Sequence, residues 1–171
     1  MKINRINTLA FFLILFIGFS ASSCKKDSKQ TDNLIGTWTA GTPVYTVMVG
    51  TKTLTQYYTD VMGMSASQAL QATTIVNLAI MQTFTGTIQF KSDNTYTSTM
   101  GGSVETGTWS LSSDAKTLTL SPVGGTPVNI TITSLTSNKL NATLTDTESE
   151  DLNSDGTPET LTISVTLPFT K

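Results

Sequence analysis

From residue 34 onward, apolar and polar residues alternate in short runs that are separated by polar turns. Alternation with a period of two puts successive side chains on opposite faces of a strand, so it predicts strands with one buried and one wetted face. The clearest runs are residues 128–135 and 160–169, where Thr is the main residue of the wetted face. Further strands are expected over residues 34–39, 44–50, 85–91, 95–100, 104–111, 117–121 and 140–146.

These strands are joined by tight turns, which predicts an antiparallel meander. A meander of about eight or nine strands is best accommodated in a closed up-and-down barrel, because closure leaves no exposed edge. The fold class expected is therefore mainly β, with the inward faces of the strands forming the core.

A helical insertion near residues 53–82 interrupts the alternation. Ser65 and Gln68 have the spacing of a capping box, and small apolar residues follow at helical intervals. A helix is predicted over residues 66–82, after a short helix over 53–61. No charged residue lies in the 61–90 segment, so the long helix is expected to be covered on several sides.

The first residues form an export signal. Lys2 and Arg5 precede an uncharged apolar run, residues 9–19, which is too short to cross a bilayer comfortably as a helix. Small residues follow, and then comes Cys24, the single cysteine of the chain. This arrangement resembles a bacterial lipobox, although Ala21 stands where Leu is usual. The alternative is an ordinary secretory signal with an incidental Cys.

The lipobox resemblance divides the chain into a signal peptide (1–23), a lipidated Cys24 with a flexible polar tether (24–33), and one barrel domain (34–171). Acyl chains such as palmitate on Cys24 would give stable membrane anchoring. The sequence SSCKKD is similar to lipoproteins of the Bacteroidetes. That similarity implies the outer membrane, at its periplasmic face or at the cell surface.

Composition excludes several classes of function. The net charge of the 171-residue chain is -2, which argues against nucleic acid as a partner. The chain has no His, so it lacks the commonest general base and metal ligand. A single Cys also excludes an intrachain disulfide and a Cys-rich zinc site. An enzyme is therefore not expected.

Two Gly-X-Trp motifs carry a family resemblance. Gly36 and Trp38 lie on the first predicted strand, and Gly107 and Trp109 repeat the motif in mid-chain. With the surrounding meander, they resemble the lipocalin-like domain found in Bacteroidetes lipoproteins. In lipocalins the first Trp closes one end of the barrel, and the Gly permits close backbone approach. Lipocalins also pack an Arg on that Trp, whereas Arg5, in the signal, is the only Arg here.

A possible calcium loop lies within residues 151–159. Its sequence fits Asp-X-Asn-X-Asp-Gly-X-X-Glu, and calcium prefers several oxygen ligands around a sharp turn. Six acids and no basic residue occur between Lys139 and Lys171. The candidate ligands are Asp151, Asn153, Asp155, Thr157 and Glu159. The alternative is a plain solvated turn, because Asn-Ser-Asp-Gly is also good turn chemistry.

Two functions remain open. The resemblance implies binding or carriage of a small apolar ligand in the barrel, with the helical insertion as a lid. Candidate lid residues are Tyr57, Tyr58, Met62, Met64, Leu70, Val76 and Met81. The alternative is a non-catalytic accessory lipoprotein whose filled barrel docks on an envelope protein. The two functions differ in whether the barrel is hollow.

Overall fold

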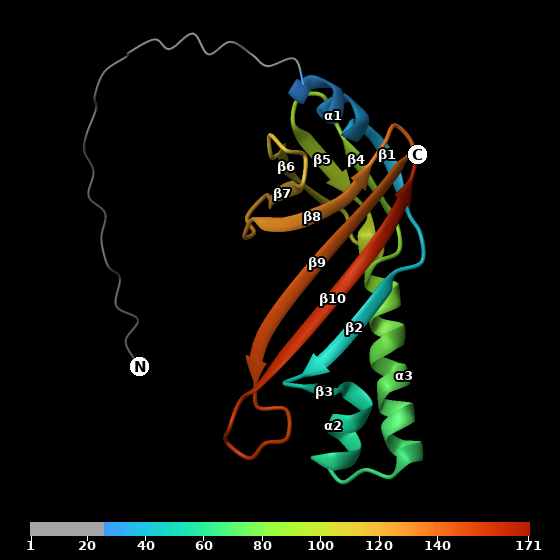
Figure 1. Cartoon of the computed structure of the whole chain (residues 1–171), viewed down its shortest axis with the longest axis vertical. Coiled ribbons are helices and arrows are strands. Elements are labelled where there is room, and N and C mark those ends of the chain that lie inside the picture. Colours follow the sequence, from blue (N-terminus) through green and yellow to red (C-terminus); the bar gives the residue numbers. More distant parts are fainter. Residues whose placement is uncertain (1–25) are drawn as a thin grey trace, which may run out of the picture.

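The computed structural model describes residues 26–171, which form a ten-stranded antiparallel sheet and three α-helices (Figure 1). The signal peptide and Cys24 lie outside the described residues. In chain order the strands are β1 (Gly36–Ala40), β2 (Val44–Val49), β3 (Lys52–Thr53), β4 (Thr87–Phe90), β5 (Thr95–Ser98), β6 (Glu105–Leu111), β7 (Thr117–Pro122), β8 (Val128–Leu135), β9 (Lys139–Glu150) and β10 (Glu159–Thr170). The helices are α1 (Lys26–Leu34), α2 (Leu54–Asp60), α3 (Ala66–Thr83) and the short 3-10 helix η1 (Met100–Gly102).

Eight of the strands close into a barrel, which confirms the predicted fold class. The hydrogen-bonded order runs β1-β4-β5-β6-β7-β8-β9-β10, and β1 returns to pair with β10. The closing contact is short, because only Thr39 and Ala40 of β1 face β10. The remaining strands, β2 and β3, lie outside this ring and extend the sheet from the far part of β10.

The β9–β10 hairpin is longer than the sequence predicted. Each strand has twelve residues, and β9 continues to Glu150 instead of ending at Asp146. Its last residues are polar and exposed, so they carry no alternation signal. They remain in the strand because their backbone is paired with β10. The hairpin therefore projects beyond the barrel, and β2 lies alongside it (Figure 1).

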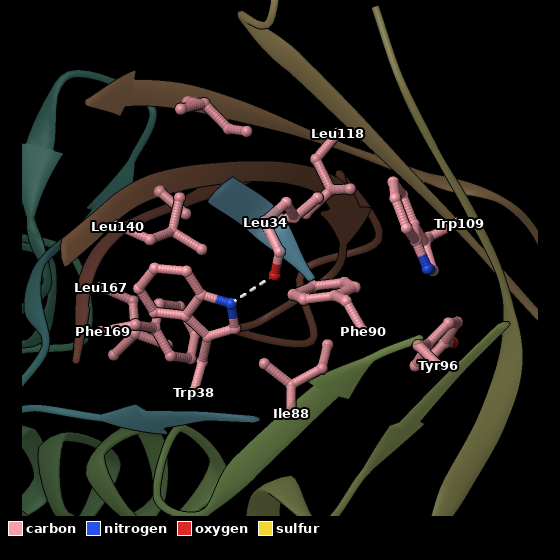
Figure 2. Packing of buried hydrophobic residues seen from close by; sticks show 12 residues of the cluster. Leu34, Trp38, Ile88, Phe90, Tyr96, Trp109, Leu118, Leu140, Leu167 and Phe169 are labelled. Atoms are coloured by element: carbon pink, nitrogen blue, oxygen red, sulfur yellow. Dashed lines mark hydrogen bonds between the residues drawn. The ribbon is translucent and has the colours of Figure 1, made fainter. Parts of the chain in front are cut away.

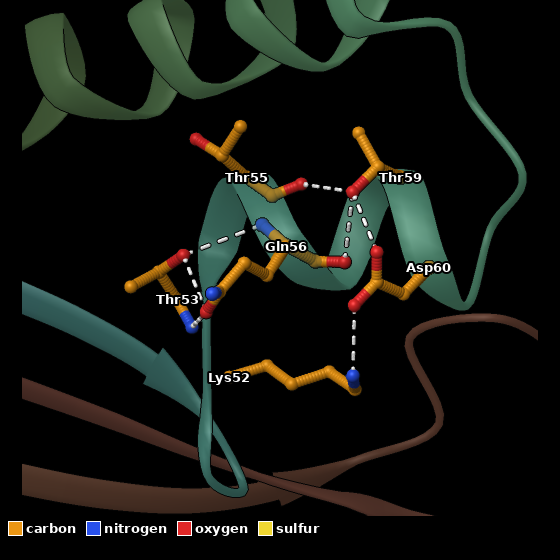
Figure 3. Close-up of polar contacts among 6 residues, drawn as sticks. All are labelled: Lys52, Thr53, Thr55, Gln56, Thr59 and Asp60. Atoms are coloured by element: carbon orange, nitrogen blue, oxygen red, sulfur yellow. Dashed lines mark hydrogen bonds and ion pairs between the residues drawn. The ribbon is translucent and has the colours of Figure 1, made fainter.

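The two predicted helices of the insertion are confirmed as α2 and α3. Each begins with a complete capping box: Thr53 with Gln56, drawn in Figure 3, and Ser65 with Gln68. The two-residue strand β3, which had no alternation to reveal it, leads directly into α2. None of the helices in residues 26–171 has both the length and the apolar character needed to cross a bilayer.

The expectation that α3 is covered on several sides is wrong. Leu70, Ile75 and Leu78 are each more than half exposed. The helix buries Ala69 near its start and Ile80 near its end, and it leaves the intervening outer face to solvent. The Gln, Thr and Asn side chains of α3 are polar enough to interact with water although they carry no charge. The absence of charged residues therefore did not show that the helix is buried.

The predicted tether also differs from the structure. Residues 26–34 form the helix α1, although their sequence has no apolar residue before Leu34. Leu34 explains the order at this end of the helix, because its side chain is fully buried in the barrel core. The start of the domain is thus a helical cap on the barrel.

Trp38 closes this end of the barrel, as the lipocalin resemblance implied (Figure 2). Its ring is fully buried, and its Nε1–H donates a hydrogen bond of 2.7 Å to the carbonyl oxygen of Leu34. The Nζ of Lys171 lies 4.6 Å from the ring centroid and also donates to the Asn33 carbonyl at 2.6 Å. Lys171, directly after β10, thus takes the place on Trp38 of the Arg that the resemblance implied and that this part of the chain lacks.

The two motif glycines are required for different reasons: Gly36 by its positive φ, since the Lys171 side chain beside it is flexible and could move, and Gly107 by a close approach of backbone. A Cβ at Gly36, whose φ is +133°, would lie 2.7 Å from Cε of Lys171. A Cβ at Gly107 would lie 2.2 Å from the backbone oxygen of Ser121. The second motif tryptophan, Trp109, packs edge-on against Phe90 with ring centroids 5.7 Å apart. Both motifs therefore shape the closed end.

Trp38→Phe should destabilise the protein by about 1–3 kcal/mol, because it leaves the buried carbonyl of Leu34 without its donor. The loss should appear as a lower urea midpoint. Thr37→Ser, on the exposed face of the same strand, is the matched control and should change stability by less than about 0.5 kcal/mol. Equal midpoints for both variants would contradict the assigned role of Trp38.

Candidate functional site

The end of the barrel opposite Trp38 contains an apolar cavity of about 710 Å³. Its wall includes Leu120, Ile130, Leu144, Val165 and Leu167, which are the inward members of alternating strands. Cavities of a few hundred to a thousand Å³ are typical of small-molecule sites. The barrel is therefore filled at one end and hollow at the other.

Small side chains keep this half of the barrel hollow. Ala142 on β9 lies between Ile132 and Leu167 in the hydrogen-bonded register, and all three point inward. A methyl group at this position leaves space that a larger residue would fill. Ser98 on β5 is the buried polar residue of the wall, and its Oγ accepts a hydrogen bond from the backbone N–H of Met100.

One acidic residue reaches the cavity. Glu105 begins β6 at the cavity wall and is exposed to solvent. Its Oε1 accepts a 2.6 Å hydrogen bond from the hydroxyl of Tyr96, which is buried in the core. Burial raises the pKa of Tyr96, and the bond to Glu105 raises it further. The pair thus presents a carboxylate at the edge of an apolar chamber.

A second cavity, of about 440 Å³, lies between α3 and the β9–β10 hairpin. It shares wall residues with the first cavity: Ala79, Thr83, Phe84, Leu144 and Val165. Phe84 caps the C-terminal end of α3 and packs against the barrel core. The two cavities therefore adjoin one another at the end of this helix.

The predicted lid residues are only partly at these cavities. Val76 lines the second cavity, whereas Leu70, Met62 and Met81 are exposed, and Tyr57 is a buried residue of α2. Tyr58 packs beside Tyr57 and Met64 is half-buried in the following turn, and neither lines the two apolar cavities. The insertion does border the cavities, but mainly through other residues.

The sequence analysis missed the wall residues at the end of α3, which are Ala79, Thr83 and Phe84, and also the two acids Glu105 and Asp146. Ala79 and Thr83 are one helical turn apart, on the inner side of α3, and Phe84 ends that helix. The helix predicted over residues 66–82 included Ala79 but ended before Thr83 and Phe84, and helical periodicity did not predict that this end of the helix lies against the hairpin. A signal could have been Phe84 itself, a large aromatic residue directly after the last helical turn.

The 151–159 loop is closed by its own side chains. Asp151 accepts hydrogen bonds from the backbone N–H groups of Asp155 and Gly156, and Asp155 accepts from that of Thr157. Asn153 also bonds Asp155, both to its backbone and to its carboxylate. The bond from the Thr157 backbone is the main reason why the pKa of Asp155 is lowered.

The fifth candidate ligand, Glu159, is hydrogen-bonded to other groups, although it lines the same small pocket as Asn153 and Asp155. Its Oε1 accepts from the Tyr57 hydroxyl at 2.6 Å, and its Oε2 accepts from the Leu152 backbone at 2.9 Å. Within residues 26–171, no group of three or more His, Cys, Asp or Glu side chains is arranged to hold a metal ion. Calcium binding stays a prediction, beside the alternative of a self-bonded turn.

Sequence comparison identifies a family for most of the barrel. The family described as lipocalin-like domain matches residues 34–142, from the end of α1 to the middle of β9. A crystal structure of a DUF4847 family protein from Bacteroides vulgatus is similar at 15% sequence identity and a TM-score of 0.38. That similarity covers 80% of this chain and 92% of the other. No curated protein shows significant similarity to the chain.

The Tyr57–Glu159 hydrogen bond should make stability depend on pH. Burial is the main cause that raises the pKa of Tyr57 to about 12, and Glu159 adds to it. The folded protein therefore holds this proton more tightly than the unfolded chain does. The resulting stability is complete below about pH 10 and is lost as pH rises through about 12.

Urea unfolding at about pH 9 and about pH 11 measures this dependence. Tyr57→Phe should show a smaller loss of stability between the two pH values than wild type, because the titrating group is gone. An identical loss in both proteins would contradict the assignment.

If calcium binds the loop, it should raise the melting temperature of wild type, because a ligand that binds only the folded state stabilises it. Asp151→Asn with Asp155→Asn should abolish the calcium-dependent increase, whatever its effect on the starting value. Asp114→Asn, in the exposed β6–β7 turn, is the matched control and should retain the increase. Melting curves of wild type that coincide with and without calcium would exclude the site.

Proposed function

The chain belongs to the lipocalin-like domain family, and from this premise we propose that it binds and carries a small apolar molecule in the barrel cavity. The observation that carries the proposal is the cavity of about 710 Å³ at the open end. Burial of an apolar ligand there would remove both its surface and the cavity wall from water, which is favourable. No catalytic step is part of the proposal.

The cavity also distinguishes the carrier from the alternative, an accessory lipoprotein whose filled barrel docks on an envelope protein. A barrel that served only as a docking body would be most stable with a filled interior, because each void forfeits packing contacts. This barrel is filled around Trp38 and hollow around Ile130. The arrangement favours a ligand site over a filled docking body, and an envelope partner could still receive the ligand.

We further propose that the protein acts as a lipid-anchored outer-membrane carrier. The support is the sequence: a basic start, a short apolar run, and Cys24 directly after small residues. Acylation of Cys24 would hold the domain at the membrane surface. An anchored carrier could take an apolar molecule up from the membrane or deliver one to it.

Ligand binding is tested with a cavity-filling variant. Ile130→Trp projects an indole into the cavity, whereas Thr131→Trp places one on the exposed face of the same strand. Titration with Nile red, an uncharged apolar dye, should show saturable fluorescence for wild type and Thr131→Trp. Ile130→Trp should weaken binding by about tenfold or more, which corresponds to roughly 1.4 kcal/mol. Equal affinities for the two variants would contradict the cavity as the site.

The anchor is tested by growth with labelled palmitate. Wild type and Lys25→Ala should incorporate the label and sediment with the outer membrane. Cys24→Ala should do neither, because the acylated sulfur is absent. Incorporation of label into Cys24→Ala would contradict the assignment of the anchor.

A further inference from the structure

Resting on the proposed function, we propose that the ligand is an elongated amphiphile with a neutral or cationic head group. Its chain would pass from the barrel cavity into the groove between α3 and the β9–β10 hairpin. Two independent features of the cavities support this class of ligand: the walls that they share and the sign of their charged groups.

The two cavities adjoin one another along shared walls. Leu144 of β9 and Val165 of β10 are directly paired, so their side chains form one floor beneath both cavities. On the opposite side, Ala79 and Thr83 are one turn apart on α3 and line both cavities with small side chains. A compact ligand would occupy only the barrel half, whereas an extended chain could contact the whole floor.

Along the row of inward residues on β9, the floor changes from apolar in the barrel to acidic in the groove. Ala142 and Leu144 line the barrel cavity, and Asp146, two residues further along, lines the groove. Alternation puts these three side chains on one face of the strand. An apolar chain lying along this row would bring a polar head to the carboxylate of Asp146, which is exposed to water.

The charges favour one sign of head group. In the described part of the chain, the charged side chains that line the two cavities are Glu105 and Asp146, both acids. No basic side chain of residues 26–171 lines either cavity, and two of the lysines are engaged elsewhere: Lys52 is paired with Asp60 at 2.9 Å, and Lys171 lies over Trp38 at the closed end. An anionic head would meet repulsion at either end of the cleft, whereas a cationic head would be attracted.

Three probes with the same chain separate these classes: dodecylamine, dodecanol and dodecanoate. Each displaces Nile red from the purified full chain, below the concentration at which the probe forms micelles. Dodecylamine and dodecanol should compete at concentrations about tenfold or more below that of dodecanoate. Competition by dodecanoate as strong as that by dodecanol would overturn the proposal.

A charge variant identifies the groups responsible. Glu105→Gln retains an acceptor for the Tyr96 hydroxyl, and Asp146→Asn retains the shape of the side chain. In the double variant, the affinity ratio of dodecylamine to dodecanoate should fall to about threefold or less, with dodecanol as the reference within each protein. An unchanged ratio would overturn the charge assignment.

A groove variant tests the length of the ligand. Ile163 lines the groove but not the barrel cavity, so Ile163→Trp should weaken the binding of dodecanol more than that of octanol, whose shorter chain extends less far toward the groove. Equal weakening of both alcohols would overturn the extended binding mode. Failure of all probes to compete, together with equal dye binding by wild type and Ile130→Trp, would instead contradict the proposed function itself.

Discussion

The buried contact between Trp38 and the carbonyl of Leu34 governs the shape of the molecule, because it joins α1 to β1 inside the barrel. Lys171 covers the same ring and bonds Asn33, so both ends of the domain meet at one point. The large apolar side chains gather around this contact. The space they leave at the other end of the barrel becomes the cavity.

The insertion between β1 and β4 gives that cavity its second half. It adds β2 and α2 to the projecting part of the β9–β10 hairpin, and α3 returns the chain to the barrel. Phe84, where α3 ends, touches both the barrel core and the groove. A barrel closed at one end and extended at the other is thus suited to hold a chain-like apolar molecule. The acids Glu105 and Asp146 disfavour an anionic head group on that molecule.

Local patterns predicted the elements of this fold better than they predicted the site. Alternation identified the barrel strands, and the capping box of Ser65 and Gln68 located the start of α3, because both signals are fixed by neighbours along the chain. The helix α1 and the end of β9 were missed, since tertiary contacts of Leu34 and pairing with β10 hold them in place. The cavity walls at Ala79 and Phe84 arise from where a helix end meets a distant hairpin, which periodicity does not encode. Cys24 and calcium binding stay predictions.

Methyl NMR of the protein titrated with dodecanol tests the central claim most directly, because it reports where the ligand lies. Ligand in the barrel should shift the methyl resonances of Ile130 and Leu144 on the cavity wall. Leu34, which lies beside Trp38 at the closed end, should shift little. Shifts confined to Leu70 and Leu78, which are exposed on α3 and line neither cavity, would contradict the account and assign binding to the outer surface of that helix.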